Sequence, residues 1–269
     1  MKDKIMVFIP MYNCENQIGR VLGKFDERAQ RLFKEIVVID NISPDDSVLK
    51  AKQGLQLLSH VKTTLLKNHE NYSLGGSIKV AFNYALEHEY DYVITLHGDD
   101  QGNIQDILSY LEQGLYSEHD IVVGARFHKD SILHGYSFIR TVGNHVVNFI
   151  CSIITSKKID DMVAGLNIFK TSFLSKDFYK FYPNNLTFDA HVLLYALSKK
   201  KSVEYIPISW REEDQVSNAK VVRQGITLLK LFFKYFFLKE KMFKSKENEF
   251  SRIDYSSEVI IKNERIDND

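Results

Sequence analysis

The chain has 269 residues, of which 44% are hydrophobic and 26% are charged, a composition typical of a globular protein with one large domain. Lysine plus arginine and aspartate plus glutamate both number 35, so the net charge gives no indication of a nucleic-acid partner. The only cysteines, Cys14 and Cys151, form no metal-binding spacing and suit a reducing cytoplasm.

The first half of the chain alternates between apolar runs and helical segments. Continuous apolar runs predict buried strands at residues 5–9, 35–40, 61–66, 91–96 and 120–124. The stretches between them predict helices at residues 15–33, 75–88 and 103–115, and Pro44 suits the first position of a further helix. Strands that are apolar throughout and alternate with helices are typical of a parallel sheet covered on both faces, so we predict a Rossmann-like α/β fold.

The alternation becomes less regular after about residue 126. Helices are predicted at residues 138–154 and 188–199, and strands at residues 166–169 and 203–210. From about residue 245 the chain is polar and charged, which predicts a flexible tail. We therefore expect a globular domain, an amphipathic helix and a tail over residues 1–222, 223–243 and 244–269, respectively.

Residues 225–243 are dense in Leu and Phe, with interspersed lysines. On a helix, Lys230, Lys234 and Lys241 fall on nearly one side, opposite an apolar band. This composition is typical of a helix in a membrane interface, and it also fits a terminal helix packed on the core. Other apolar runs are too short for a signal peptide or a spanning helix, so we expect a cytoplasmic protein, peripheral on the inner face of the membrane.

Polar residues follow four of the predicted strands, as "PMYNCEN", "DNISPDD", "NHENYSLGG" and "HGDDQGN". In doubly wound sheets, ligands bind at the carboxyl ends of the strands, so these four segments together predict a site. No GxGxxG follows the first strand and no GxxxxGK[ST] occurs, which excludes a nicotinamide fingerprint and a P-loop. Bound phosphates must therefore be held by a metal ion or by basic side chains.

The segment after the fourth strand carries the residues best suited to a metal. In an extended backbone, His97, Asp99 and Gln101 share one side, and Asp100 lies on the other. Imidazole, carboxylate and amide oxygen suit Mg²⁺ or Mn²⁺. The alternative is that the two aspartates cap the next helix while His97 makes an ordinary hydrogen bond.

The same motifs, in the same order, occur in a known family. The chain resembles the family-2 glycosyltransferases of the GT-A fold, and most closely the branch with dolichyl- and polyprenyl-phosphate sugar synthases. The similarity spans about residues 5–211. It rests on "IPMYNCEN", "VVIDNISPDDS", "NYSLGGSIKVAFNYA", "LHGDDQGN", "VVGARF", "DDMVAGLNIF" and "FDAHVLLYALSKKKSVEYIPISWR".

The resemblance implies roles for the donor side. It assigns binding of the nucleotide to Pro10, Tyr12, Glu15, Asp40, Asn41 and Gly76. It places Asp99 and Gln101 in the metal motif, with His97 where the family has its first acid. A further departure is Cys14, which replaces the glutamate that normally follows Asn13; Glu15 stands one place later.

The resemblance also implies an acceptor side. Arg126, Arg140, Asn144 and Arg211 match positions that grip the acceptor phosphate, although each arginine also fits a surface ion pair. Arg140 and Asn144 are four residues apart on a predicted helix and therefore share a face. A further motif of the lipid-phosphate branch is only loosely matched, by Ser217 and Lys220.

The implied reaction is inverting transfer of a sugar from a UDP- or GDP-linked donor to a membrane-associated acceptor. The acceptor would be a polyprenyl phosphate or a lipid-linked glycan of cell-envelope polysaccharide synthesis. Mg²⁺ or Mn²⁺ would act as a Lewis acid on the leaving diphosphate, with Asp99 and Arg126 as catalytic residues. For a hydroxyl acceptor, Asp189 is the candidate base; it also fits an orienting residue or a helix cap.

Two other functions compete with this one. A nucleotidyltransferase would need a Gly-rich, basic loop after the first strand, and "PMYNCENQIG" contains none. A relative that binds nucleotide sugars but has lost catalysis is motivated by the substitutions at His97 and Cys14.

Overall fold

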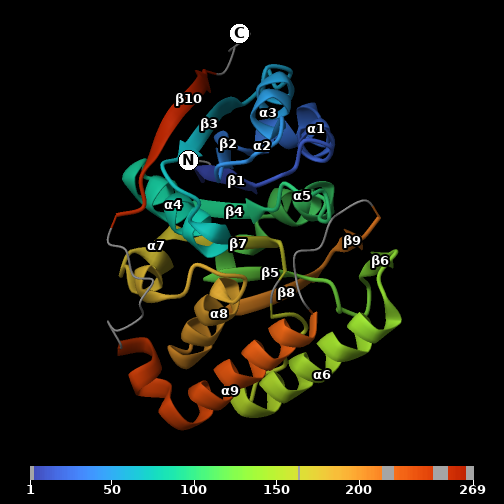
Figure 1. Ribbon diagram of the computed structural model, residues 1–269, viewed down its shortest axis with the longest axis vertical. Coiled ribbons are helices and arrows are strands. Elements are labelled where there is room, and N and C mark those ends of the chain that lie inside the picture. Colours follow the sequence, from blue (N-terminus) through green and yellow to red (C-terminus); the bar gives the residue numbers. More distant parts are fainter. Residues whose placement is uncertain (1–2, 163, 214–220, 245–253, 265–269) are drawn as a thin grey trace.

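The structure is a computed structural model, shown in Figure 1. It describes residues 3–162, 164–213, 221–244 and 254–264. Within these residues the central sheet has eight strands, in the order β10-β3-β2-β1-β4-β7-β5-β8. Their bounds are β1 (Ile5–Met11), β2 (Glu35–Asp40), β3 (Lys62–Asn68), β4 (Tyr92–Leu96), β5 (Ile121–Ala125), β7 (Leu166–Lys170), β8 (Val203–Pro207) and β10 (Ser257–Asn263).

Most neighbouring strands are parallel. The exceptions are β7, which runs antiparallel between β4 and β5, and β10, which runs antiparallel to β3. Every residue of β1, β2, β4 and β5 is buried, because helices cover both faces of the sheet. The predicted α/β fold with a mostly parallel, helix-flanked sheet is therefore confirmed.

Two layers of helices enclose the sheet and form a hydrophobic core on each face. One layer consists of α1 (Ile18–Gly23), α2 (Glu27–Leu32), α3 (Ser47–Leu55) and α5 (Gln105–Glu112). The other consists of α4 (Ser73–Glu87), α6 (Phe138–Thr155), α7 (Thr171–Leu174), α8 (Phe188–Ser198) and α9 (Val221–Lys244). The single helix predicted over residues 15–33 is in fact α1 and α2. The break occurs at Asp26, whose carboxylate accepts the backbone N–H of Ala29 and caps α2.

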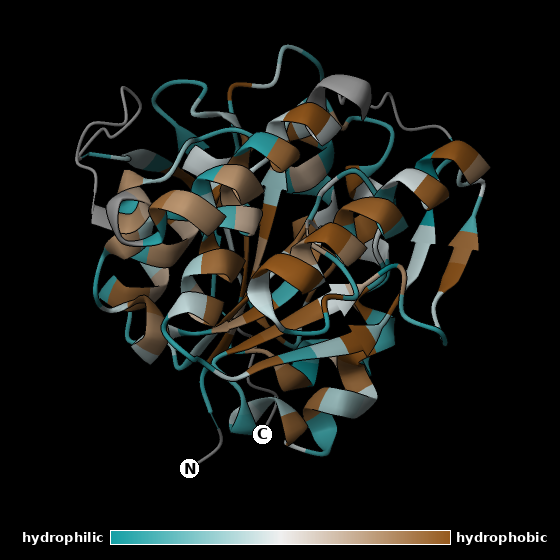
Figure 2. Ribbon diagram, turned by 90° about the horizontal axis from the view of Figure 1, so that it is seen from below, coloured by the Kyte–Doolittle hydropathy of each residue, from teal (hydrophilic) through white to brown (hydrophobic). Residues whose placement is uncertain are grey.

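Helices α6 and α9 lie side by side at one end of the molecule (Figure 1). Leu228, Leu231, Phe232 and Tyr235 attach α9 to the core. Both helices also expose large apolar side chains, and Figure 2 shows apolar residues over the helices on this side. The exposed side chains are Phe138, Ile139, Val142, Val146, Phe149 and Ile153 on α6, and Ile226, Leu229, Phe233, Phe236, Phe237 and Leu238 on α9. We call these residues the α6/α9 face.

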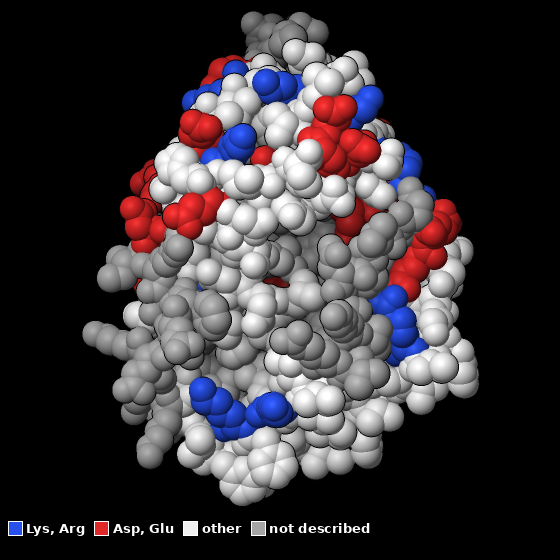
Figure 3. All heavy atoms as spheres, in the orientation of Figure 1, with Lys and Arg blue, Asp and Glu red and all other residues white. Residues whose placement is uncertain are grey.

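Basic side chains accompany the α6/α9 face. Figure 3 shows them over α9, where Lys230, Lys234 and Lys239 are exposed. Lys241, predicted on the same side, has a side chain outside the described part. None of the helices described in residues 3–162, 164–213 and 221–244 is both long and apolar enough to cross a bilayer.

The strand predicted at residues 203–210 is divided into β8 and β9 (Ser209–Arg211), and strands β6 (Ile132–His134) and β10 were not predicted. Strands β6 and β9 form a small parallel sheet outside the central one. The expected flexible tail is corrected by β10, which lies within residues 244–269 and pairs with residues 63–68 of β3. Its sequence, SEVIIKN, is short and bears charged residues, so its composition resembles that of the tail around it.

Candidate active site

A cleft of about 980 Å³ opens at the carboxyl ends of the strands, next to α6 and α9. Most of the residues predicted for the site line this cleft, and they come from five separate segments of the chain. Those that line it are Pro10, Tyr12, Glu15, Asn41, His97, Asp99, Gln101, Arg126, Arg140 and Asn144. Asp40, Gly76, Asp189 and Arg211 are not among the lining residues.

The nucleotide end of the cleft is built by the loops after β1 and β2. Asp40 is buried; one carboxylate oxygen accepts the backbone N–H of Ser43, and the other has no hydrogen-bond partner in the described chain. Asn41 accepts the backbone N–H of Tyr72, which ties β2 to the start of α4. Gly76 contributes space instead of a binding group, because a Cβ there would lie 2.4 Å from the Cβ of Tyr72.

Cys14 and Glu15 shape the loop after β1. The thiol of Cys14 is buried and donates to the carbonyl of Tyr12. Burial raises the pKa of Cys14 to about 12, so the thiol stays protonated. Glu15 accepts the backbone N–H of Asp46, and its own N–H is accepted by Asp45. Glu15 therefore joins the first two strand-end loops by two hydrogen bonds.

The tip of β4 presents His97, Asp99 and Gln101 to the cleft. The backbone is not extended here: it turns at Gly98 and Asp99. The backbone N–H of His97 donates to Gly165, and its Nε2 is buried without a partner in the described residues. Asp99 accepts the backbone N–H of Gln101 at 3.2 Å. Burial raises the pKa of Asp99 and lowers that of His97.

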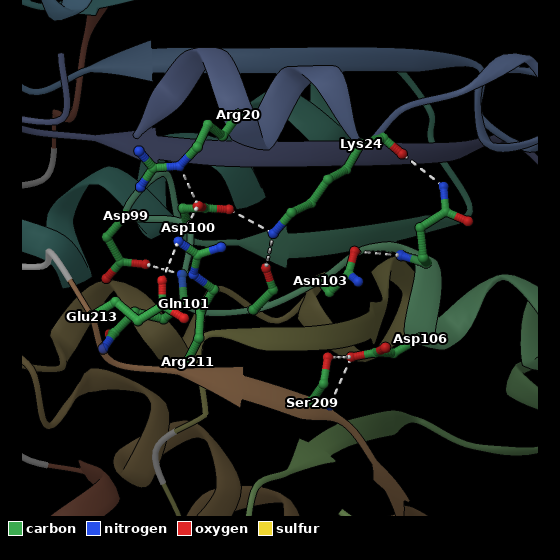
Figure 4. A network of polar contacts seen from close by, with 12 residues as sticks. Arg20, Lys24, Asp99, Asp100, Gln101, Asn103, Asp106, Ser209, Arg211 and Glu213 are labelled. Atoms are coloured by element: carbon green, nitrogen blue, oxygen red, sulfur yellow. Dashed lines mark hydrogen bonds and ion pairs between the residues drawn. The ribbon is translucent and has the colours of Figure 1, made fainter. Parts of the chain in front are cut away.

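Asp100 points away from the cleft and anchors this turn, as Figure 4 shows. Its φ of 62° is in the left-handed region, and its side chain is fully buried. Arg20 and Lys24 contact its two oxygens at 2.7 and 2.5 Å, and Arg211 lies 3.5 Å away. These cations compensate the buried charge, so Asp100 holds Asp99 and Gln101 at the edge of the cleft.

The tip of β4 offers few protein ligands to a metal ion among the described side chains. No group of three or more His, Cys, Asp and Glu residues in the described chain could hold a metal ion. His97 and Asp99 nevertheless fit a partial site, because one imidazole nitrogen is unsatisfied and the carboxylate borders the cleft. A metal that also binds substrate phosphates needs few protein ligands.

Arg126 and Arg140 line the other end of the cleft and form ion pairs with different partners. Arg126 is buried and makes a two-pronged ion pair with Asp161, at 2.8 and 2.9 Å. Burial alone would lower its pKa, but Asp161 and, more weakly, Glu212 raise it. Arg140 contacts Glu212 at 2.5 Å and stacks over Tyr136.

The remaining predicted acceptor residues are also engaged. Asn144 donates to the hydroxyl of Tyr136 and to the carbonyl of Arg140. Arg211 pairs with Glu213 at 3.0 Å, in addition to its contact with Asp100. Ser217 and Lys220 lie outside the described residues.

Asp189 is separate from the cleft. It lies near the start of α8, and its side chain borders a small internal cavity together with Asn167. One carboxylate oxygen has no partner within the described chain, and burial raises the pKa of Asp189 to about 7. Neither the general-base role nor a capping hydrogen bond is supported by this position.

Sequence reasoning did not single out Asp161, Glu212 or Trp210. Asp161 was visible only as part of a matched motif, and Trp210 lines the cleft with an indole nitrogen that has no partner in the described chain. Glu212 follows Arg211 directly in the sequence. This adjacency gave no indication that the carboxylate of Glu212 would pair with Arg140.

A family model described as "Glycosyl transferase family 2" matches residues 6–178, more than half of the chain. The chain belongs to glycosyl transferase family 2. The dolichyl-phosphate beta-glucosyltransferase of Saccharomyces cerevisiae is 25% identical over 232 residues, 78% of this chain and 67% of that protein. The UDP-N-acetylglucosamine--dolichyl-phosphate N-acetylglucosaminyltransferase of Methanococcus voltae is 23% identical, over 77% of this chain and 86% of that protein.

Two further comparisons cover a large part of the chain. A Methanocaldococcus jannaschii protein is 27% identical over 169 residues, and the match spans 65% of its length. Among solved structures, glucosyl-3-phosphoglycerate synthase from Mycobacterium tuberculosis has a TM-score of 0.61 and 15% identity, over 86% of this chain and 80% of that one. One crystal structure of that enzyme contains Mn²⁺, UDP and glucosyl-3-phosphoglycerate. At this identity the likeness concerns the fold.

Proposed function

We propose that this family-2 glycosyltransferase transfers a sugar from a UDP- or GDP-linked donor to an acceptor at a membrane surface. The observation that carries the proposal is the single cleft. It joins the loops after β1, β2 and β4 to helices α6 and α9, through Ile139, Val147 and Leu228. A hydrophilic donor and an acceptor with an apolar chain would both find suitable walls in it.

The donor would occupy the end built by β1, β2 and β4. Tyr12 is 44% exposed at the mouth, so its ring is available to a nucleobase. Asn41 lines this end and suits the ribose hydroxyls, whereas the adjacent Asp40 is buried and does not line the cleft. His97, Asp99 and Gln101 would hold Mg²⁺ or Mn²⁺, which when bound would draw negative charge from the leaving diphosphate. The yeast and archaeal relatives are named for transfer to dolichyl phosphate, which supports the acceptor side of the proposal.

The acceptor would enter along α6, past Arg140 and Asn144. A polyprenyl phosphate is already anionic, so its oxygen can attack the anomeric carbon without a general base. This agrees with the absence of Asp189 from the cleft lining. A lipid-linked glycan, whose hydroxyl does need a base, is the other acceptor class for the same membrane location.

The α6/α9 face supplies the membrane contact in this proposal. Its exposed apolar side chains lie on the helices that border the acceptor end of the cleft. In the described chain no carboxylate forms an ion pair with Lys230 or Lys234. An apolar face with adjacent lysines matches an anionic bilayer surface.

The decisive experiment is sugar transfer to a polyprenyl phosphate in vesicles, with a panel of UDP- and GDP-sugars and Mn²⁺. We expect Asp99→Asn to lower kcat about 100-fold or more, because the carboxylate borders the site of charge development. Asp91→Asn is the matched control, since Asp91 is exposed at the opposite end of β4, where its carboxylate accepts the backbone N–H of Lys4. Equal turnover in both variants would contradict the role of Asp99.

A second outcome concerns the substitutions at His97 and Cys14. If the unaltered protein binds a nucleotide sugar in calorimetry but transfers nothing to polyprenyl phosphate or glycan acceptors, it is a binding relative that has lost catalysis. Turnover with any acceptor in the panel rejects that alternative.

A further inference from the structure

The ion pair between Arg140 and Glu212 occupies the acceptor end of the cleft. The guanidinium and carboxylate are 2.5 Å apart, and their side chains are 23% and 15% exposed. The pair is therefore partly accessible to water, unlike the pair between Arg126 and Asp161, whose side chains are 8% and 1% exposed. Of these two cleft arginines, only Arg140 has a partner that solvent can reach.

The backbone holds Glu212 in this place. Its N–H donates to the carbonyl of His134 at the end of the β6/β9 sheet. Gly135 has a φ of 69°, and a Cβ there would lie 2.2 Å from the Glu212 carbonyl oxygen. Only glycine allows the two segments to approach so closely. The main chain at Glu212 is thus fixed, while its side chain retains rotatable bonds.

Glu212 also contacts the donor end of the cleft. Its other carboxylate oxygen lies 3.4 Å from the side-chain nitrogen of Gln101, near the limit of a hydrogen bond. Gln101 lies beside Asp99 at the tip of β4, where the donor diphosphate is proposed to bind. The carboxylate of Glu212 therefore contacts both Arg140, which is assigned to the acceptor, and Gln101, which is assigned to the donor.

We propose that Glu212 is the resident counter-ion of an anion subsite at Arg140, and that the phosphate of the acceptor replaces its carboxylate there. The proposal rests on the proposed function for the identity of the acceptor. A phosphomonoester carries a charge of about −1.5 to −2 at pH 7 and offers three acceptor oxygens, whereas Glu212 offers one charge. A phosphate can thus compete for Arg140, and a neutral hydroxyl group cannot.

Glu212 is then a specificity-determining residue. While the subsite is empty, it prevents Arg140 from attracting singly charged anions into the cleft. Because its charge opposes any incoming anion, it weakens the binding of every anion and leaves only those with the strongest interaction. Removing that charge should tighten phosphate binding and reduce discrimination against weaker anions.

The test measures binding without donor, metal or turnover, by calorimetry with inorganic phosphate, farnesyl phosphate and acetate. Glu212→Gln keeps the shape of the side chain and removes the charge. We expect its Kd for farnesyl phosphate to fall about tenfold, and that for acetate to fall into a measurable range. Glu112→Gln is the matched control, because it removes the same charge from a surface pair with Arg28 between α2 and α5.

The double variant Glu212→Gln/Arg140→Gln should lose the gain, because the subsite would then lack its cation. A gain with both phosphates assigns the subsite to the phosphoryl group, and a gain with farnesyl phosphate alone assigns it to a lipid phosphate; both support the proposal. Unchanged affinities in Glu212→Gln, or a gain that persists without Arg140, would overturn it. A protein that shows the gain but transfers no sugar would refute the proposed function alone.

Discussion

At the scale of single residues, Asp189 has an unusual environment for a carboxyl group. It is buried beside Asn167, whose side-chain oxygen also lacks a partner among the described residues. Burial without a cation disfavours the ionised form, which is why the pKa of Asp189 rises from 3.8 to about 7. Such a group costs stability wherever it must ionise in the folded protein.

The sign of the effect follows from proton binding. Between pH 4 and 7 the folded protein keeps the proton on Asp189 and the unfolded chain releases it. The contribution of Asp189 to stability is therefore greatest below about pH 4 and is lost as the pH rises through about 7. Asp189→Asn, which cannot ionise, should be more stable than the unaltered protein at pH 8 by up to about 4 kcal/mol, with little difference at pH 4.

Urea unfolding of both proteins at several pH values measures this difference. Sugar transfer by the same variant tests the role in catalysis that the resemblance implies for Asp189. Because its side chain does not line the cleft, we expect Asp189→Asn to retain transfer. A variant that is stable and inactive would instead show that Asp189 takes part in the reaction.

Residues of the candidate site were predictable where a side chain suited to ligand binding follows a buried strand. His97, Asp99 and Gln101 follow a buried strand, and the structure brings all three to one cleft. The partners of the arginines were not predictable, since Asp161 and Glu212 reach them through tertiary packing across 35 and 72 residues of chain. Sequence spacing does not record such contacts.

At the scale of elements, β10 joins the end of the chain to the wall of the cleft. Tyr255, just before β10, donates its hydroxyl to Asn184 and accepts from the buried ammonium of Lys79. The side-chain oxygen of Asn184 also accepts a hydrogen bond from the ammonium of Lys79, and its backbone carbonyl accepts the N–H of Gly75. The next residues along the chain, Asn185 and Leu186, line the cleft. Their placement depends on this network.

We predict that Tyr255→Phe destabilises the protein by roughly 1.5–3 kcal/mol, because a buried ammonium loses a hydrogen-bond partner. Tyr205→Phe is the control: the hydroxyl of Tyr205 is buried without a partner in the described chain, so its removal should be neutral or stabilising. Unfolding in urea measures both variants. Equal stabilities of the two would contradict a role for the network.

Strand predictions succeeded or failed according to burial. The runs that became β1, β2, β4 and β5 are continuously apolar because both of their faces are covered. β10 is an edge strand with one neighbour, and two of its three exposed positions carry charged side chains, Glu258 and Lys262. Its composition is therefore that of a loop, and only the pairing with β3 distinguishes it.

At the scale of the whole molecule, apolar surface is concentrated at one end. The α6/α9 face lies far from β10 and from the charged surface over α1 and α3 (Figures 1 and 3). Its helices also border the cleft, so an acceptor in a bilayer would reach the site without leaving the surface. Seven side chains on this face are more than 60% exposed: Phe138, Ile139, Phe149, Ile153, Phe233, Phe236 and Phe237.

This arrangement predicts binding to anionic membranes through the α6/α9 face. Replacing Phe149, Phe233 and Phe236 by Ser should release the protein from phosphatidylglycerol vesicles, since each inserted ring contributes roughly 1.5–3 kcal/mol. Lys230→Gln/Lys234→Gln should weaken binding to these vesicles by about 1 kcal/mol per lysine and leave binding to neutral vesicles unchanged. Cosedimentation with vesicles of each kind measures the bound fraction.

The control for this experiment replaces exposed apolar residues at the opposite end. Leu57 and Val259 are 80% and 59% exposed, so changing both to Ser removes exposed apolar surface without touching α6 or α9. That variant should bind vesicles as the unaltered protein does. If the Phe variant binds equally well while remaining folded, the α6/α9 face is not the membrane contact. Its apolar side chains would then require a protein partner, such as a second copy of the chain, which sedimentation equilibrium would detect.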